Sequence, residues 1–448
     1  MKYDVIVIGG GAGGIATSLA VKSLYPEKKV LVIRRTKKQP IPCGVPYIIE
    51  ALGSVDKNLI PDKIYENLGI ELLIDEVVEI DREHKKVKTK SGKEFEYEKL
   101  VIATGARPVK LKIPGIDLEN VILVYKEYEP LTEVFDKLKN AKKIVIIGAG
   151  FVGIEFADDL AKGREIHIVE LLDEALPLAF DKEFGEIARK ELEAKGVKFH
   201  FGVSVKEIKG EGKVEKVVLS NGEEIPADAV LVSVGVAPNS ELAKKAGLAV
   251  DERGHIIVDA YMRTSDPDIY AVGDVAQKKS FFTGTPTKAY FASIAVIEGR
   301  VAALHMFGGK TAPGFTDGAL PAYSTFVGKT ALAAAGLTEA LAKKLGFDVI
   351  AVTTETVNRH PGSLPGAGKI KLKAIFTKGD LRLVGVQIAG PESVGELINY
   401  AAAAIQLKLT AYDIIKLQMA TQPMLTASPI GYPLQVAALK AIAMARKE

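Results

Sequence analysis

The stretch YDVIVIGGGAGGIATSLAV, residues 3–21, decides how the first part of the chain folds. An apolar run leads into a glycine-rich turn, and a run of small and apolar residues follows. Gly9, Gly11 and Gly14 form the pattern G-x-G-x-x-G. Glycine permits the tight turn, the close approach of a pyrophosphate and the packing of helix on strand. The pattern therefore predicts a strand–turn–helix unit whose helix N-terminus binds the phosphates of a dinucleotide.

A second unit of the same kind begins at KKIVIIGAGFVGIEFADDLAKG, residues 142–163, and the strand that follows it ends at Glu170. A carboxylate there can accept hydrogen bonds from both ribose hydroxyls of NADH, and it repels the 2′-phosphate of NADPH. No arginine follows in the segment 170–176. We therefore expect NADH in preference to NADPH. Two dinucleotide folds in one chain predict two dinucleotides, and FAD with NADH is the simplest pair.

Three shorter signals accompany these units. LVIATGARP (100–108) and AVLVSVGVAPN (229–239) are apolar strands that run into glycine turns, and TSDPDIYAVGDVA (264–276) leads to Gly273 and Asp274. A carboxylate at a strand end beside a nucleotide can hold a ribityl hydroxyl, although an isolated Gly-Asp pair is more often a plain turn. Because all five signals occur in one chain, they support one another.

The glycine pattern stops at about Ala319. KIKLKAIFTKGDLRLVGVQIAG, residues 369–390, predicts a β-hairpin that turns at residues 378–380, and helical segments follow. The predicted fold class is α/β, with two Rossmann-like dinucleotide-binding domains and a C-terminal α+β domain. The predicted domains are residues 1–110 and 240–318 (FAD-binding, discontinuous), 111–239 (NADH-binding) and 319–448 (an assembly domain).

Composition excludes several classes of protein. The chain has 448 residues and a formal net charge of +3, which gives no reason to expect nucleic acid or a membrane surface as a partner. No apolar run reaches the length of about 18 residues that spans a bilayer. The N-terminal run lacks the pattern of a signal peptide, so we expect a cytoplasmic protein. A single cysteine excludes an intrachain disulfide, and no Cys/His spacing predicts a metal site.

That cysteine is Cys43, in QPIPCGVPYIIE, residues 39–50. An isolated cysteine is usually a small buried hydrophobe. A lone thiol near a flavin, however, can accept two electrons by cycling with an external sulfur or oxygen atom. It then alternates between thiolate and mixed disulfide, persulfide or sulfenic acid. The CGVPY context favours the redox function.

With these motifs in this order, the chain resembles the FAD-dependent pyridine nucleotide–disulfide reductases over essentially its whole length. CGVPY is similar to the CGxPY motif of the single-cysteine branch. That branch contains coenzyme A disulfide reductases, coenzyme A-dependent persulfide and polysulfide reductases, NADH peroxidase and water-forming NADH oxidase. The resemblance implies a homodimer assembled through the domain 319–448, with Cys43 as the catalytic thiol. The candidate FAD contacts are Gly9, Gly11, Ala12, Gly13, Gly14, Arg34, Ala103, Thr104, Gly105, Gly273 and Asp274. The candidate NADH contacts are Gly148, Gly150, Phe151, Val152, Gly153, Glu170 and Gly235.

Two departures from the family's patterns reduce the number of candidate substrates. The peroxidases and oxidases carry a histidine in the first glycine turn, where this chain has Ala12. The coenzyme A disulfide reductases carry two tyrosines in loops of the dimerisation domain, where this chain has Ser363 and Thr421. A persulfide needs less help than a disulfide, because sulfide leaves more readily than an alkyl thiolate. We therefore expect an NADH-dependent reductase of low-molecular-weight persulfides or polysulfides that releases hydrogen sulfide.

A third departure concerns Arg34, which ends the second strand where the family has a glutamate for the adenosine ribose of FAD. A cation cannot accept hydrogen bonds from ribose hydroxyls. We expect Arg34 to stack on adenine or to contact a phosphate. The run of Arg34, Arg35, Lys37 and Lys38 is either a solvated loop or a dock for the phosphates of coenzyme A, which is a candidate substrate or ligand.

Three other functions stay open at this point. The first is reduction of coenzyme A disulfide. The second is an NADH oxidase in which reduced flavin meets oxygen and Cys43 takes no part. The third is an electron-transfer flavoprotein that serves a small redox partner.

Overall fold

The computed structural model describes residues 1–308 and 314–447. The contacts within the chain divide it into two compact units. The first consists of Met1–Leu111, Leu123–Asn140 and Val234–Ala319, and the second of Lys112–Ile122, Ala141–Ser233 and Leu320–Glu448.

The first unit is built on a mixed sheet of seven strands within the described residues. Its strands are β1 Lys2–Ile8, β2 Val30–Arg34, β5 Glu71–Ile74, β6 Val77–Asp81, β7 Lys86–Thr89, β8 Glu94–Ile102 and β19 Ile269–Ala271. They lie in the order β5-β2-β1-β8-β7-β6, with β19 paired to β8. The pairs β1–β2, β1–β8, β2–β5 and β8–β19 are parallel. Their carboxyl ends therefore share one edge of the sheet, where nucleotides bind in such folds.

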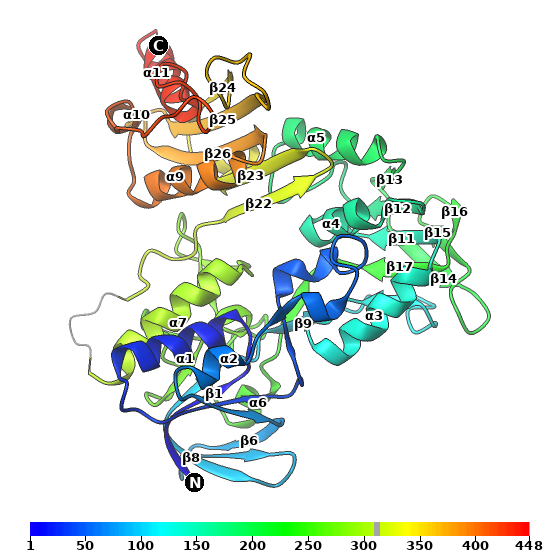
Figure 1. The fold of residues 1–448 in the computed structure, drawn as a ribbon, viewed down its shortest axis with the longest axis vertical. Helices are drawn as coiled ribbons and strands as arrows, with labels where there is room; N and C mark the ends of the chain where they lie inside the picture. Colours follow the sequence, from blue (N-terminus) through cyan, green and yellow to red (C-terminus); the bar gives the residue numbers. More distant parts are fainter. Residues whose placement is uncertain (309–313, 448) are drawn as a thin grey trace. The chain divides into compact units, whose positions relative to one another are not determined.

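Two helices cover one face of this sheet, α1 (Ala12–Leu24) and α7 (Ala292–Met306). The two helices lie side by side (Figure 1). Small residues such as Gly13 and Gly299 allow their backbones to approach closely. A Cβ atom on Gly299 of α7 would lie 2.8 Å from the carbonyl oxygen of Gly13. The remaining helices of the unit are short or peripheral: α2 Lys63–Glu66, α3 Tyr128–Asn140, α6 Glu241–Lys245, η1 Pro42–Tyr47, η2 Val55–Lys57 and η3 Gly273–Val275.

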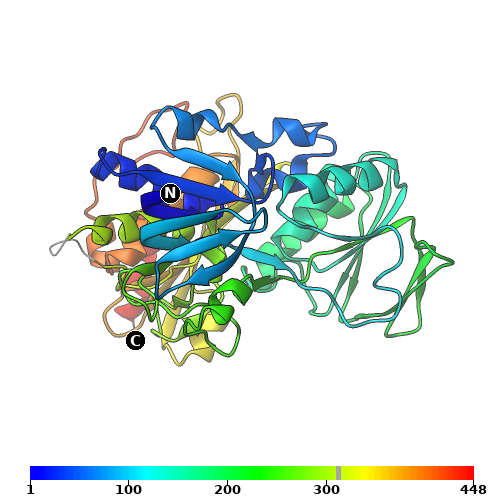
Figure 2. The ribbon, with the colours of Figure 1, turned by 90° about the horizontal axis from the view of Figure 1, so that it is seen from below.

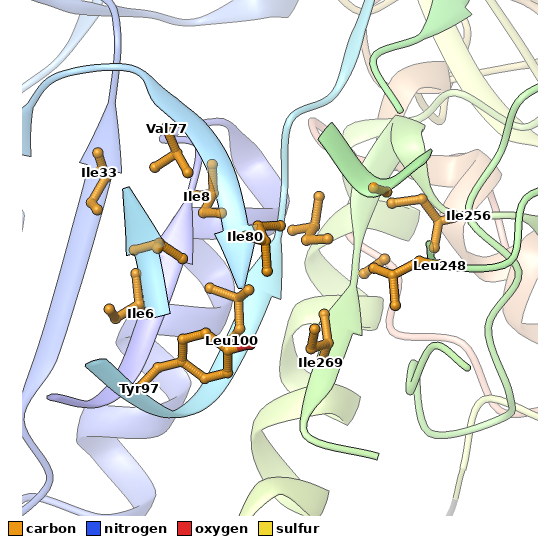
Figure 3. Packing of buried hydrophobic residues seen from close by; sticks show 14 of the residues in the cluster. Ile6, Ile8, Ile33, Val77, Ile80, Tyr97, Leu100, Leu248, Ile256 and Ile269 are labelled. Carbon is orange, nitrogen blue, oxygen red and sulfur yellow. The ribbon is translucent and has the colours of Figure 1, made fainter. Parts of the chain in front are cut away.

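The core of the first unit follows from the alternation of side chains along β1. Val5 and Val7 point towards the α1–α7 face and pack with Val32 and Val101. Ile6 and Ile8 point to the other face, where Leu100 also packs (Figure 3). Because β1 is apolar on both faces, it occupies the centre of the sheet, among the blue strands of Figure 2.

Small two-stranded ribbons extend this unit. They are β3 Gln39–Pro40 with β4 Leu59–Ile60, β9 Ala106–Pro108 with β18 Val236–Pro238, and β20 Lys278–Lys279 with β21 Pro286–Thr287.

The second unit contains a parallel sheet that repeats the plan of the first. Its strands are β10 Val121–Leu123, β11 Lys143–Ile147, β12 Glu165–Glu170, β13 Lys198–Phe201 and β17 Ala229–Val232, in the order β10-β17-β11-β12-β13. Two helices accompany the sheet, α4 (Phe151–Leu160) and α5 (Lys182–Glu193). A three-stranded antiparallel sheet, β14 Val205–Lys209, β15 Lys216–Leu219 and β16 Glu224–Pro226, is attached. Both strand–turn–helix predictions are thus confirmed, since β1–α1 and β11–α4 lie where the glycine patterns placed them.

The C-terminal part of the second unit is an antiparallel sheet with helices. Its strands are β22 Ala322–Val327, β23 Thr330–Gly336, β24 Val349–Val357, β25 Lys369–Thr377 and β26 Leu383–Gly390, in the order β22-β23-β26-β25-β24. Its helices are α8 Glu339–Lys344, α9 Val394–Gln406, α10 Ala411–Ile414 and α11 Pro433–Ala445. The predicted hairpin is confirmed, because β25 and β26 pair antiparallel around residues 378–382. The predicted fold class, α/β with an α+β C-terminal domain, is confirmed as well.

Candidate active site

The first glycine turn connects β1 to α1 and is shaped by contacts that exclude side chains. Gly9 has φ +111°, and a Cβ atom there would lie 2.2 Å from the carbonyl oxygen of Ala103 at the end of β8. A Cβ atom on Gly14 would lie 2.1 Å from the carbonyl oxygen of Gly9. Both distances are far below van der Waals contact, so β1, α1 and β8 approach this closely only with glycine at these positions.

Gly11 is different, because a Cβ atom there would meet nothing in the described chain within 4 Å. Gly11 is the N-cap of α1, and it supplies no side-chain hydrogen bond; the first turn of α1 contains no acidic residue. The first backbone N–H groups of α1 have no partner within the helix, and the positive end of the helix dipole lies at this turn. That cradle fits the pyrophosphate of a dinucleotide.

The other predicted FAD contacts lie at the same edge of the same sheet. Ala103–Gly105 follow β8, and Gly273 and Asp274 follow β19. Thr104 donates to the carbonyl of Asn239 (2.7 Å), and the side chain of Asn239 donates back to the carbonyl of Thr104 (3.0 Å). A Cβ atom on Gly13 would lie 3.4 Å from the Gly273 nitrogen. The structure thus brings these predicted residues together around one glycine turn.

A buried ion pair that the sequence analysis missed holds the turn at Gly273. Glu298 of α7 accepts a hydrogen bond from the Gly273 nitrogen (2.7 Å), and Lys278 donates to the Gly273 carbonyl (2.6 Å). The two side chains pair with each other at 3.0 Å and are 1% and 2% exposed. The adjacent Asp274 carboxylate, 15% exposed, lies 3.3 Å from Lys126. The sequence did contain a signal for this ion pair. Glu298 stands among small and apolar residues in VIEGRVAAL (296–304), and a buried carboxylate without a cationic partner would be costly.

Cys43 is exposed on the 3-10 turn η1, between β3 and β4. Asn58, which the sequence analysis also missed, holds this turn. Its backbone accepts from the Ile41 nitrogen (3.0 Å), and its buried side chain donates to the Ile41 carbonyl (3.0 Å). Gly44 packs directly on it, since a Cβ atom on Gly44 would lie 2.0 Å from Asn58 Oδ1. No sequence pattern pointed to Asn58, because the contact depends on the pairing of β3 with β4.

The cysteine loop begins beside the first glycine turn. A Cβ atom on Gly10 would lie 3.0 Å from Oε1 of Gln39, the first residue of β3. Cys43 follows four residues later. The segment that carries Cys43 therefore starts beside the proposed phosphate cradle of the first unit.

We predict that Gly44→Ala lowers thiol-dependent turnover by roughly tenfold to a hundredfold, because the added methyl group collides with Asn58 and displaces the Cys43 turn. The double variant Gly44→Ala/Asn58→Ala removes the colliding atoms and should recover much of the loss. Steady-state rates of the two variants and of Asn58→Ala alone make the comparison. A double variant no better than Gly44→Ala would contradict this account of the loop.

The basic run before Cys43 is largely neutralised within the chain. Arg34 is buried and pairs with Asp62, Arg35 pairs with Glu127, and Lys38 pairs with Asp56 at 2.6 Å. Three of the four cations thus already have a carboxylate partner. This arrangement favours the interpretation of the run as a salt-bridged loop over that of a phosphate dock.

The second glycine turn, between β11 and α4, repeats the geometry of the first. Gly148 has φ +105°, and a Cβ atom on it would lie 2.7 Å from the carbonyl oxygen of Ser233. A Cβ atom on Gly153 would lie 2.0 Å from the Gly148 carbonyl oxygen, whereas one on Gly150 would meet nothing in the described chain within 4 Å. Phe151 and Val152 form the first turn of α4. This unit therefore also offers a helix N-terminus to a pyrophosphate.

Glu170 ends β12 with its carboxylate turned to this glycine turn. It accepts hydrogen bonds from the backbone nitrogens of Ala149 (2.8 Å) and Leu172 (2.9 Å). Two further acidic residues follow Glu170, Asp173 and Glu174, and burial together with the charge of Asp173 raises the pKa of Glu174. Gly235 belongs to the first unit, where its carbonyl accepts from the Val109 nitrogen (3.0 Å).

We predict that Glu170→Ala raises the KM for NADH roughly 20-fold with little change in kcat, because a ribose interaction is lost in substrate and transition state alike. The KM for NADPH should stay the same or fall, since the repulsion of its 2′-phosphate is removed. Glu170→Gln is the matched control, because it keeps an acceptor oxygen without the charge. An unchanged NADH-to-NADPH ratio in both variants would contradict the assignment.

Glu155 of α4 provides a pH-dependent contribution to stability. Burial raises the pKa of its carboxyl to about 7, against the opposing effect of the hydrogen bond from Thr325. The folded protein therefore binds a proton more tightly than the unfolded chain does. The free energy of unfolding should fall as the pH rises from about 4.5 to about 7.

We predict that Glu155→Gln flattens this pH profile. The variant should match the wild type near pH 5 and exceed its stability by about 2 kcal/mol at pH 8. Denaturant unfolding of both proteins at the two pH values measures the difference. Parallel profiles for the two proteins would show that Glu155 does not titrate in this way.

Comparison with known proteins identifies the family. A family model of the pyridine nucleotide-disulphide oxidoreductases matches residues 3–296, and the model of their dimerisation domain matches residues 323–429. The chain belongs to the pyridine nucleotide-disulphide oxidoreductases. Membership implies FAD and a nicotinamide nucleotide as the two dinucleotides, and the dimerisation domain indicates a homodimer.

Individual relatives extend over the whole chain. The NAD(P)H coenzyme A polysulfide/persulfide reductase of Pyrococcus horikoshii is 34% identical over 448 residues, with 98% of each chain covered. An NADH oxidase of Methanocaldococcus jannaschii is 32% identical over 452 residues, also with 98% of each chain covered. The solved structure of an NAD-dependent persulfide reductase from A. fulgidus has a TM-score of 0.90 at 34% identity and covers 100% of this chain and 84% of its own.

The described residues contain no group of three or more His, Cys, Asp or Glu side chains suited to a metal ion. None of the helices in that part of the chain combines the length and the apolar character needed to cross a membrane.

Proposed function

We propose that the chain is an NADH-dependent flavoprotein reductase of low-molecular-weight persulfides and polysulfides, such as coenzyme A persulfide, with hydrogen sulfide as a product. The observation that carries the proposal is the cysteine loop. Cys43 is exposed on a turn that Asn58 and Gly44 frame, and the strand that leads to this turn begins at Gln39, beside Gly10. A cysteine that merely fills a core is buried instead. The names of the persulfide-reducing relatives support the same substrate class.

FAD fits the first unit. The open N-terminus of α1 at Gly11 suits its pyrophosphate, and the Asp274 carboxylate suits a ribityl hydroxyl. FAD, when bound, supplies the means to take a hydride from NADH and to pass two electrons to a sulfur atom. Its binding residues in this proposal are Gly9, Gly11, Ala12, Gly13, Gly14, Ala103, Thr104, Gly105, Gly273 and Asp274. Arg34, expected to stack on adenine or to contact a phosphate, is instead buried, with its guanidinium bound to Asp62 and to two backbone carbonyls.

NADH fits the second unit. The N-terminus of α4 at Gly150 suits the pyrophosphate, and Glu170 can accept hydrogen bonds from the ribose hydroxyls. The remaining residues proposed for NADH are Gly148, Phe151, Val152 and Gly153.

Cys43 performs the sulfur chemistry in this proposal. Its thiolate attacks the outer sulfur of a persulfide R–S–SH, the S–S bond breaks, and R–S⁻ leaves and takes a proton to become the thiol. Cys43 then carries the transferred sulfur as Cys–S–SH. Two electrons that originate in NADH, with one proton, break this second S–S bond. They regenerate the Cys43 thiolate and release hydrogen sulfide.

The choice of substrate can be tested by anaerobic steady-state kinetics. We expect kcat/KM for coenzyme A persulfide to exceed that for coenzyme A disulfide by at least about tenfold, because reduction of the Cys43 persulfide expels sulfide, whereas reduction of a Cys43–coenzyme A mixed disulfide must expel an alkyl thiolate. Ser363 and Thr421 cannot provide the assistance that tyrosines give. A clear preference for coenzyme A disulfide would make the chain a disulfide reductase instead.

A further inference from the structure

The two glycine turns share a plan but differ at the end of the next strand. In the second unit, β12 ends at Glu170, and its carboxylate contacts the Ala149 nitrogen in the turn at 2.8 Å. In the first unit, β2 ends at Arg34, whose side chain lies over the matching residue Gly10. A Cβ atom on Gly10 would lie 2.9 Å from Arg34 Cδ. The first unit therefore places a cation where a dinucleotide fold needs an acceptor for ribose hydroxyls.

Arg34 brings a carboxylate to this place by binding Asp62. Its Nη1 donates to Oδ1 of Asp62 at 2.7 Å, and its Nη2 donates to Oδ2 at 2.8 Å. Nε donates to the Thr36 carbonyl (3.1 Å), and Nη2 also donates to the Lys37 carbonyl (2.9 Å). All three nitrogens of the guanidinium are thus engaged within the chain. A two-pronged contact of this kind fixes the orientation of the carboxylate as well as its position.

The side chain that would contact a ligand, Asp62, is exposed to solvent, and the side chain that holds it, Arg34, is buried. The Arg34 side chain is 2% exposed, whereas the Asp62 side chain is 40% exposed. A carboxylate offers about four acceptor positions, and the arginine occupies two of them. The remaining positions are available to hydroxyl groups, and the pairing holds the carboxylate in place.

We propose that Asp62, held by Arg34, accepts the hydrogen bonds of the adenosine ribose of FAD. This inference rests on the proposed function, because it takes FAD to be the dinucleotide of the first unit. Asp62 touches the cofactor, and Arg34 is a positioning residue that replaces the direct glutamate with an arginine–aspartate pair.

The test compares FAD with FMN, which lacks the adenosine. The full-length protein is stripped of flavin, and dissociation constants for both flavins are measured by fluorescence titration. Asp62→Ala should weaken FAD roughly 20-fold, the loss expected for hydrogen bonds to a charged group, and leave FMN within about twofold. Arg34→Met/Asp62→Ala should show the same selective loss without leaving a buried cation unpaired. Arg34→Glu/Asp62→Ala restores an acid directly on β2 and should bring FAD back to within about threefold of the wild type.

The matched control is Asp266→Ala, which also removes a carboxylate from an arginine of the first unit. Asp266 pairs with Arg82 at 2.9 Å and precedes β19, so it lies at the opposite edge of the sheet. It should alter neither flavin's affinity. The proposal is overturned if Asp62→Ala and Arg34→Met/Asp62→Ala bind FAD as the wild type does, or if they lose FAD and FMN equally. A wild type that binds no FAD would instead overturn the proposed function.

Discussion

Replacing Cys43 by serine is expected to lower persulfide-dependent NADH oxidation by roughly a thousandfold. A serine hydroxyl is a far weaker nucleophile towards sulfur than a thiolate, and it cannot carry a transferred sulfur atom. The side chain is exposed on η1, and serine is nearly isosteric, so the turn framed by Asn58 should be unchanged. Anaerobic assays with coenzyme A persulfide measure the loss.

Two properties that do not need the thiol serve as controls for the Cys43→Ser variant. Its FAD content and its slow oxidation of NADH in air should equal those of the wild type, because neither needs the thiol. If the variant retains persulfide-dependent turnover, Cys43 is a bystander. An oxidase or an electron-transfer protein would then be the better description.

Adding one methyl group at Gly11 is expected to weaken FAD binding by roughly 30-fold without changing the stability of the flavin-free protein. Gly11 has φ −76° and ψ −176°, which alanine adopts without strain, and a Cβ atom meets nothing in the described chain. The methyl group can therefore collide only with a bound group. If the pyrophosphate lies at this helix N-terminus, the methyl group displaces it.

Gly14→Ala is the informative contrast, because its Cβ atom would lie 2.1 Å from the Gly9 carbonyl oxygen. That variant should destabilise the flavin-free protein by about 3 kcal/mol. Thermal unfolding of the flavin-free proteins and FAD titration separate the two effects. A Gly11→Ala variant that binds FAD as tightly as the wild type would place the pyrophosphate elsewhere.

The strand–turn–helix units could be predicted from the sequence because their reasons are local. Gly9, Gly14, Gly148 and Gly153 are required by contacts within one turn or with the neighbouring strand. The hairpin of β25 and β26 could also be predicted from local sequence, because its turn residues lie between two apolar runs. Such features need no knowledge of distant parts of the chain.

The partners that hold the site come from remote segments, and the sequence analysis missed them. Asn58 meets Ile41 only after β3 pairs with β4, and Glu298 meets Gly273 only when α7 packs on the sheet. Arg34 was recognised as a departure, but its partner Asp62 lies 28 residues further along the chain, beyond any local pattern. Tertiary packing decides these contacts, so a single sequence carries little information about them.

The most direct test of the central claim is mass spectrometry of Cys43 during the reaction. The flavin-loaded protein is mixed anaerobically with coenzyme A persulfide, quenched, and digested, before and after NADH is added. The account predicts that the Cys43 peptide gains the mass of one sulfur atom and loses it again when NADH is supplied, while hydrogen sulfide is released. A Cys43 peptide that stays unmodified while NADH is consumed would contradict the account.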